Sequence, residues 1–230
     1  MTQRESAMGG TESLASFERV LHDHTVKFTR EDIDTQELAR RRALYGPLTA
    51  AVRDLVDATI RTEVDEAVIR EVQATIVDAT AKLRATQIDG GFGMRFTADG
   101  ESIAWGNAGI GLRNAIAPPL VIESDDAGLH WTEVSLGAAY EGPPGLVHGG
   151  ICALVMDHLL GTTASSIEPR FTGTLTLRYR RGTPLGPLRA EARIDRNDGR
   201  KTIVVGTLSD ALGVTVEAEG IFIGPAAPPA

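Results

Sequence analysis

The segment PPGLVHGGICALVMDHLLG, residues 143–161, contains the side chains best suited to chemistry. It opens with a turn that ends in His148-Gly149-Gly150 and continues as an apolar run that includes Asp157. A carboxylate among apolar neighbours needs hydrogen bonds or a cation to compensate for lost water, and such carboxylates are candidates for general bases or nucleophiles. The alternative is an aspartate that a hydroxyl or a backbone N–H satisfies and that does no chemistry.

The turn itself could bind a negative charge. Gly149 and Gly150 are expected to begin a helix, whose first N–H groups have no partner within the helix. A helix start offers hydrogen-bond donors and a positive dipole end, which suit an anion or a developing oxyanion. His148 could donate a further hydrogen bond or simply fix the loop. A turn of this kind can equally be structural, so the motif alone leaves both interpretations open.

The predicted helix has one face of small residues. Spacings of three, four and four place the following residues on that face: Gly150, Ala153, Asp157 and Gly161. All except Asp157 are small, so a backbone or a narrow ligand could approach closely. Positions 149 and 157 are eight residues apart, roughly 12 Å along a helix. One small electrophile cannot reach both, so joint action requires Asp157 from a second, antiparallel copy of the helix in a two-fold dimer.

The elements before this segment are predicted to be helical. Residues 33–83 carry apolar side chains mostly three and four positions apart, the pattern of amphipathic helices. Pro47 is expected to divide them into a short and a longer helix. We expect a helical extension packed on the main domain, with a lid or an oligomerisation arm as the functional alternative. Seven glycines from position 90 to 111 then predict an irregular connector that could line a site.

The elements around and after the segment are predicted to be strands. Strand patterns occupy residues 120–125, 130–140, 171–181, 188–196, 202–209 and 214–223. Short turns between the last four predict an antiparallel meander. The sequence therefore predicts an α+β fold in which a curved sheet lies beside one buried helix.

Composition limits the classes of function. The net charge of −8 argues against a nucleic-acid-binding protein. The single cysteine, Cys152, is typical of a reducing compartment, and we see no signal peptide and no apolar run of the ~18 residues that suggest a membrane span. We therefore expect a cytoplasmic protein without nucleic-acid partners. His22 and His24 lack a clear third ligand, so no metal site is predicted.

One stretch departs from the acidic average. Residues 171–201 contain eight basic and three acidic side chains, a local balance of +5. Such a field could attract a small polyanion, although a solvated strand face would have the same composition.

Taken together, the motifs resemble those of hotdog-fold thioesterases. The set consists of EGPPGLVHGG, an aspartate nine residues after the histidine, and FTGTLTLRYRRGTPLG after the helix; the likeness covers residues 114–224. The most similar type is the phenylacetate-degradation and human thioesterase-superfamily-member group, which acts on acyl-CoA thioesters. The resemblance implies a hotdog fold, an antiparallel sheet wrapped round one central helix, over residues 89–224. Residues 1–88 would be a polar and helical N-terminal extension, and 225–230 a disordered tail.

The resemblance also implies roles for individual residues. Asp157 corresponds to the catalytic carboxylate, Gly149 to the glycine whose N–H polarises the thioester carbonyl, and His148 to the histidine of the turn. Thr172 corresponds to a threonine near the attacking water or the carboxylate. Some members place an asparagine just before the turn to hold the substrate carbonyl. Here that stretch is EGPP, so this role is either empty or taken by His148 or Asn114.

Contacts with substrate are expected from two further places. The first is Gly150, beside the polarising glycine. The second is the basic stretch, because coenzyme A carries phosphates that suit arginine and lysine. The implied phosphate contacts are Arg178, Arg180, Arg181, Arg200 and Lys201.

The sequence thus predicts an acyl-CoA thioesterase that acts as a homodimer and could form a dimer of dimers. Coenzyme A would be part of the substrate, with no separate cofactor. One alternative is a hotdog hydratase or dehydratase of an enoyl thioester, in which His148 would pair with the carboxylate across the dimer. Another is a non-catalytic acyl-CoA-binding module whose output is the N-terminal helices. The preferred acyl group is not predicted.

Overall fold

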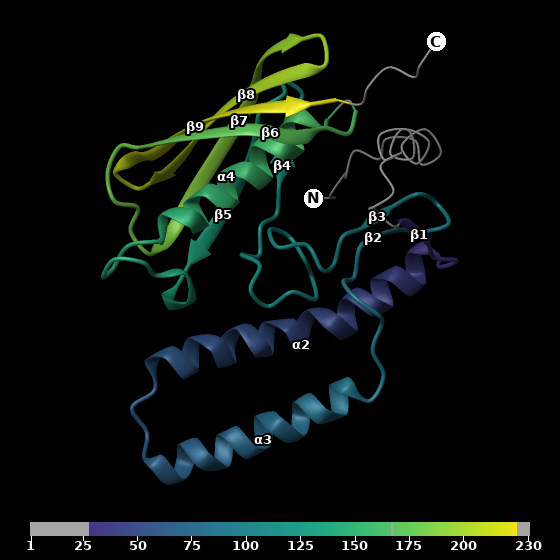
Figure 1. Ribbon diagram of the computed structural model, residues 1–230, viewed down its shortest axis with the longest axis vertical. Coiled ribbons are helices and arrows are strands. Elements are labelled where there is room, and N and C mark those ends of the chain that lie inside the picture. The colour runs from purple at the N-terminus through teal and green to yellow at the C-terminus, as the bar shows by residue number, and fades with distance from the viewer. Residues whose placement is uncertain (1–27, 167, 225–230) are drawn as a thin grey trace.

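The computed structural model describes residues 28–166 and 168–224 (Figure 1). Its main body is a six-stranded sheet that curves round helix α4 (Gly149–Ala164). The predicted histidine pair at positions 22 and 24 and the predicted tail at 225–230 lie outside the described residues. No helix of the described chain is both long and apolar enough to cross a bilayer.

All strand pairs of the large sheet are antiparallel. In spatial order the strands are β4 (Glu123–Ser124), β5 (His130–Leu136), β7 (Gly186–Asp198), β8 (Lys201–Asp210), β9 (Gly213–Ile223) and β6 (Phe171–Tyr179). The predicted meander is confirmed for β7, β8 and β9 but is wrong for β6. Because the chain crosses the sheet through α4, β6 arrives at the far edge beside β9, and β5 pairs with β7 instead.

The main core lies between α4 and the sheet. Seven side chains of α4 are buried: Cys152, Val155, Met156, Leu159, Leu160, Thr163 and Ala164. Sheet residues such as Leu136, Leu208 and Phe222 meet them and are fully buried. The predicted α+β hotdog arrangement, with one central helix against an antiparallel sheet, is therefore confirmed.

The N-terminal region has a small core of its own. Strands β1 (Phe28–Arg30), β2 (Met94–Phe96) and β3 (Ser102–Ile103) form a three-stranded sheet in that order. Next to it, the start of helix α2 (Thr35–Arg61) packs Leu38 and Tyr45 against Ile103 and Trp105. Because β1 pairs with β2 across more than sixty positions, this region links the predicted extension to the connector beyond residue 89.

The predicted helix break at Pro47 is wrong. Helix α2 continues through Pro47 and ends at Arg61, and helix α3 (Glu66–Arg84) begins after Asp65. A proline removes one helical hydrogen bond. Packing of the first half of α2 on the small core, together with burial of Thr49 just beyond Pro47, offsets that loss.

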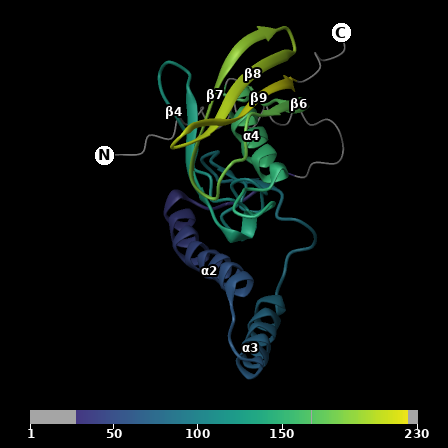
Figure 2. The ribbon, with the colours of Figure 1, turned by 90° about the vertical axis from the view of Figure 1, so that its left-hand side faces the viewer.

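The two helices differ in how they meet the rest of the chain. Helix α2 contacts the 3-10 helix η1 (Ala138–Tyr140), and Arg53 donates a hydrogen bond to the Asn114 carbonyl at 3.1 Å. Helix α3 has no buried side chain among the described residues, and Figures 1 and 2 show it standing away from the large sheet. The expected packing on the main domain is thus confirmed for α2 and is wrong for α3, because no described element covers its apolar face.

Candidate active site

His148 caps the start of α4. Its backbone is extended, with φ −59° and ψ 134°, and its Nδ1 accepts a hydrogen bond of 2.9 Å from the Gly150 N–H. Its own N–H donates to the Tyr140 carbonyl at 2.9 Å. Because Nδ1 is the acceptor, a neutral His148 carries its proton on Nε2. The sequence predicted that His148 either donates a further hydrogen bond or fixes the loop before α4. The structure shows the second role.

The first amide of α4 has no hydrogen-bond partner within the described part of the chain. Among the described residues, no acceptor faces the Gly149 N–H, whereas the Gly150 N–H is taken by His148. The prediction of two unpaired amides is therefore confirmed for Gly149 and wrong for Gly150. The Gly149 carbonyl accepts a hydrogen bond of 2.8 Å from the Tyr179 hydroxyl, which fixes this peptide against β6.

Asp157 lies on the side of α4 that the core does not cover. The buried residues Val155, Leu159 and Leu160 point to the sheet, whereas Asp157 is only half-buried. The Thr172 hydroxyl on β6 donates a hydrogen bond of 2.9 Å to its Oδ1. The structure thus brings Thr172 and Asp157 together, while Oδ2 is left to other partners. The catalytic roles of both residues stay predictions.

Other parts of the chain border the uncovered side of α4 on both sides. On one flank, β6 holds Asp157 through Thr172 and Gly149 through Tyr179. On the other flank lies His158, about 100° round the helix from Asp157. The same side of α4 carries three small residues that are not fully buried: Gly150, Ala153 and Gly161. A Cβ added at Gly150 would meet the His148 ring, and one added at Gly161 would meet Phe222 at 3.4 Å.

His158 is covered by the loop of residues 107–117, here called the flanking loop. A Cβ added at Gly109 would lie 2.8 Å from the His158 Cγ, so only glycine allows this approach. Burial lowers the pKa of His158, and the neighbouring Asp157 carboxylate only partly opposes this effect. The imidazole is therefore neutral near pH 7 and belongs to the wall of the site.

Asn114 holds the flanking loop together. Its amide nitrogen donates to the carbonyls of Gly106 and Asn107 at 3.2 and 3.3 Å, and its Oδ1 accepts from the Ile116 N–H at 3.2 Å. The side chain is engaged in these contacts, which is a different role from the predicted one of holding the substrate carbonyl.

The basic residues predicted for coenzyme A lie at two ends of the sheet. Arg178, Arg180 and Arg181 lie at the Gly149 end of β6, the first within the strand and the other two just after it. Arg180 pairs with Glu217 at 2.5 Å, and Arg181 pairs with Asp210. Arg200 and Lys201 lie at the other end, since Lys201 aligns through Ile223 with Phe171. One protomer therefore cannot bring all five to the same phosphate group.

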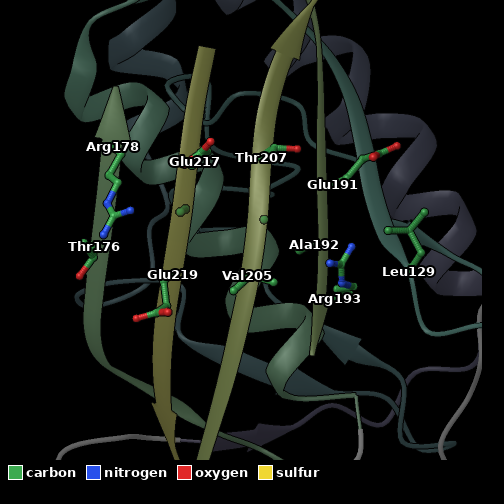
Figure 3. A pocket seen from close by; sticks show the side chains of 12 residues that line it. Leu129, Thr176, Arg178, Glu191, Ala192, Arg193, Val205, Thr207, Glu217 and Glu219 are labelled. Carbon is green, nitrogen blue, oxygen red and sulfur yellow. The ribbon is translucent and has the colours of Figure 1, made fainter. Parts of the chain in front are cut away.

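Arg178 also faces away from α4. It lines a hollow of about 370 Å³ on the outer face of the sheet, together with Thr176, Glu217, Glu219 and Arg193 (Figure 3). The hollow has both polar and apolar lining residues, and alternation along β6 places Arg178 opposite the inward side chains of Leu175 and Leu177. Arg178 thus lies across the sheet from Asp157.

Sequence reasoning missed Tyr179 and His158 as parts of the site. Tyr179 could have been found from strand alternation, because it shares the inward face of β6 with Leu175 and Leu177. His158 becomes part of the site only through Gly109, which is distant in sequence and gives no local signal. Among the described residues, no cluster of three or more His, Cys, Asp or Glu side chains is placed to hold a metal ion.

Comparisons with known proteins bear on what this site does. No protein-family model matches the chain. Acyl-coenzyme A thioesterase THEM4 of Mus musculus is 32% identical over 90 residues, which cover 38% of this chain and only 39% of the mouse protein.

Two crystal structures are also similar. That of RHA08564, a thioesterase superfamily protein, is 32% identical with a TM-score of 0.69, over 78% of this chain and 94% of that one. That of a putative thioesterase of Ralstonia eutropha JMP134, related to phenylacetic acid degradation, is 25% identical with a TM-score of 0.42, over 45% and 83% of the two chains. From its identity to RHA08564 over nearly the whole of that protein, the chain belongs to the thioesterase superfamily, whose hotdog fold it shares.

Proposed function

We propose that the protein is an acyl-CoA thioesterase, which hydrolyses an acyl-CoA thioester to a free acid and coenzyme A. The observation that carries the proposal is the hydrogen bond of 2.9 Å between Thr172 and Asp157 on the open face of α4. It orients one carboxylate oxygen and leaves the other for a water molecule. Superfamily membership and the likeness to mouse THEM4 support the same substrate class.

In the proposed reaction the thioester carbonyl accepts a hydrogen bond from the Gly149 N–H. Asp157 takes a proton from a water molecule as the water oxygen bonds to the carbonyl carbon. The carbonyl electron pair moves to its oxygen, and the Gly149 N–H and the helix dipole stabilise that oxyanion. As the pair returns, the carbon–sulfur bond breaks, and the coenzyme A thiolate receives the proton that Asp157 carries.

A second route uses the same residues. Asp157 would attack the carbonyl carbon directly and expel the thiolate, and water would then cleave the resulting anhydride. The hydrogen bond from Thr172 suits both routes because it orients the carboxylate in either case.

The proposed site needs two protomers. Gly149 and Asp157 are roughly 12 Å apart along one helix, too far to act on a single carbonyl. We propose a two-fold homodimer in which the α4 helices run antiparallel and Asp157 of each protomer faces Gly149 of the other. The free edge of β6 supports this arrangement. It has no partner strand within the described sheet, and Phe171 and Tyr179 on it are about half exposed.

Thiol release from a series of acyl-CoA esters tests the proposal. We expect steady release by the wild type and a loss of at least a thousandfold in kcat for Asp157→Asn, whose dimer and melting temperature should match the wild type. Wild-type turnover by Asp157→Asn would contradict the mechanism. Hydration of an enoyl-CoA without thiol release would favour the hydratase, and tight binding with neither reaction would favour the binding module.

A further inference from the structure

The N-terminal core contains a small cavity that the proposed reaction does not use. It has a volume of about 70 Å³ and lies where the start of α2 meets β2 and the flanking loop. The cavity has room for only a few water molecules, or for one compact ion. Four charged side chains are part of its lining: Glu31, Arg41, Arg95 and Arg113.

The charged groups at the cavity leave an excess of positive charge, although the chain as a whole has a net charge of −8. Glu31 accepts a hydrogen bond of 2.7 Å from Arg41 and another from Arg95. Burial raises the pKa of Glu31, but the hydrogen bonds and charges of Arg95 and Arg41 outweigh it and lower the pKa, so the carboxylate is ionised. Glu37, outside the cavity, pairs with both Arg40 and Arg41. These three arginines and two glutamates keep one positive charge, to which Arg113 adds a second.

Arg113 has no anionic partner in the described part of the chain. Its guanidinium lies 4.0 Å from the ring centre of Tyr45 and 5.5 Å from that of Phe92. The rings attract its charge but leave its five N–H groups without a strong acceptor, and no described residue accepts a hydrogen bond from them. The residue is exposed, so a ligand can reach the cavity beside it from solvent. A guanidinium held between rings in this way is preorganised for an anion.

The other two arginines also have hydrogen-bond donors to spare. Nη2 of Arg41 and Nη2 of Arg95 donate to no described residue, because Glu31, Glu37 and a backbone carbonyl engage only their other nitrogens. Guanidinium groups pair well with the oxygens of phosphates and carboxylates. A local charge of +2 attracts a phosphate dianion more strongly than a singly charged carboxylate. The chemistry of the cavity therefore favours phosphate.

The flanking loop connects this cavity with the candidate site. The Arg113 N–H donates to the Trp105 carbonyl at 2.9 Å, which fixes the loop beside the cavity. Further along the loop, the Ile116 carbonyl accepts a hydrogen bond of 3.3 Å from the Tyr140 hydroxyl. The Tyr140 carbonyl in turn accepts from the His148 N–H. A ligand at Arg113 would thus join α2 and β2 to the loop that borders α4.

We propose that the cavity of the N-terminal core binds one phosphate group, held by Arg113 together with Arg41 and Arg95. Inorganic phosphate and the 3′-phosphate of coenzyme A present the same oxyanion, and the choice of ligands below distinguishes these two sources. The inference goes beyond the proposed function and does not depend on it.

Tryptophan fluorescence can report on the cavity directly. The chain has two tryptophans, of which Trp105 lines the cavity and Trp131 lies on β5. In Trp131→Phe, Trp105 is the only tryptophan, and phosphate added at constant ionic strength should give a saturable change in its emission. Sodium chloride at the same ionic strength should give none. Trp105→Phe, which keeps Trp131, should not respond to phosphate. Calorimetry of the wild-type chain gives the same Kd without relying on a fluorophore.

Substitutions of arginine, made in the Trp131→Phe chain, test which groups hold the phosphate. Arg113→Gln removes the charge and should weaken phosphate binding at least about tenfold. Arg113→Lys keeps the charge but not the fork of donors, and should weaken it severalfold. Arg42→Gln is the matched control, because Arg42 follows Arg41 on α2 but pairs with Glu101 at 2.6 Å and does not line the cavity. Its Kd should stay within about twofold of the parent value.

Titrations with coenzyme A, dephospho-coenzyme A and acetate identify the source of the phosphate group. Tighter binding of coenzyme A than of inorganic phosphate would assign the cavity to the substrate, and dephospho-coenzyme A would show whether the 3′-phosphate is the group bound. Equal or tighter binding of inorganic phosphate would assign it to the free ion. Acetate that binds as tightly as phosphate would overturn the proposed class of ligand.

Two further results would overturn the inference. One is the absence of saturable binding of phosphate and of coenzyme A by both fluorescence and calorimetry. The other is an equal Kd in Arg113→Gln and Arg42→Gln, which would mean that phosphate responds only to the general charge of the region. Neither result bears on the proposed thioesterase, which thiol release and Asp157→Asn test separately.

Discussion

Helix α4 is apolar and α3 is amphipathic; they are of similar length, with 16 and 19 residues, yet they have opposite surroundings. Helix α4 buries seven side chains against the sheet, and its uncovered face carries small residues and a carboxylate. Helix α3 buries none, and its uncovered face carries Val68, Val72 and Leu83, each more than a third exposed. The comparison shows that the spacing of apolar residues within a segment determines whether a helix forms. Strands distant in sequence determine which side of that helix stays uncovered. On α4 that open face is where chemistry is possible.

After Asp157→Asn, the next largest loss of activity is expected from a change at the start of α4. Gly149→Pro removes the unpaired N–H, and the fold should survive because proline suits the first helical position and His148 already has the extended backbone that must precede it. We expect a loss of about a hundredfold to a thousandfold in kcat for acyl-CoA hydrolysis. Gly149→Ala keeps the N–H and is the control; an added Cβ would meet Tyr179 at 3.4 Å, an ordinary contact. Equal activity of the two variants would contradict the proposed role of the amide.

The contrast in packing can be measured with one leucine from each helix. Leu159 in α4 is fully buried and Leu83 in α3 is 57% exposed. Leu159→Ala should lower the free energy of unfolding by about 3 kcal/mol, from lost burial and the cavity left behind. Leu83→Ala should change it by less than about 0.5 kcal/mol. Chemical denaturation monitored by circular dichroism would show the difference, and similar losses would mean that α3 is covered in solution.

A smaller loss of activity is expected from a change at the contact between β6 and α4. Thr172→Val keeps the shape of the side chain and removes the hydrogen bond to Asp157. Because one such bond to a charged group contributes on the order of 1.5 kcal/mol, kcat should fall about tenfold with KM nearly constant. Thr174→Val, at an exposed position on the same strand, should have no effect. A fall in stability without a fall in kcat would assign Thr172 a structural role only.

The smallest effect concerns the pH dependence of stability. Burial lowers the pKa of His158 in the folded protein below its usual 6.5. The unfolded chain therefore takes up a proton near pH 6.5 while the folded one does not, and stability falls as the pH drops below 6.5. Ion-paired carboxylates change the stability only at lower pH, because Arg181 holds the pKa of Asp210 at about 2. His158→Gln should flatten the pH dependence of Tm between about pH 5 and 6.5, and an unchanged slope would contradict this assignment.

Much of the main body could be predicted from sequence. The helix at α4, its small-residue face and the strands after it follow from periods of 3.6 and 2 that each segment carries by itself. The motif around His148 and Asp157 also places the candidate site on α4, and the catalytic roles of these residues stay predictions. The contact between Thr172 and Asp157 was implied by resemblance alone.

The predictions that the structure contradicts share a physical cause. The place of β6 beside β9, the continuity of α2 through Pro47 and the exposure of α3 all depend on partners distant in sequence. The pairing of the Gly150 N–H with His148 was missed because a histidine side chain is an uncommon helix cap. The flanking loop was predicted only as an irregular connector, because its contacts with His158, Tyr140 and α2 are all non-local.

The central claim is that each site combines Gly149 of one protomer with Asp157 of the other. Mixing Asp157→Asn subunits with Gly149→Pro subunits tests it, because neither variant alone has a complete site. A mixed dimer would contain one intact site and one doubly defective site. If subunits exchange freely in equal amounts, half of the dimers are mixed, so we predict recovery of about a quarter of wild-type thiol release. No recovery, in a sample where mixed dimers are detected by mass spectrometry, would contradict the shared site.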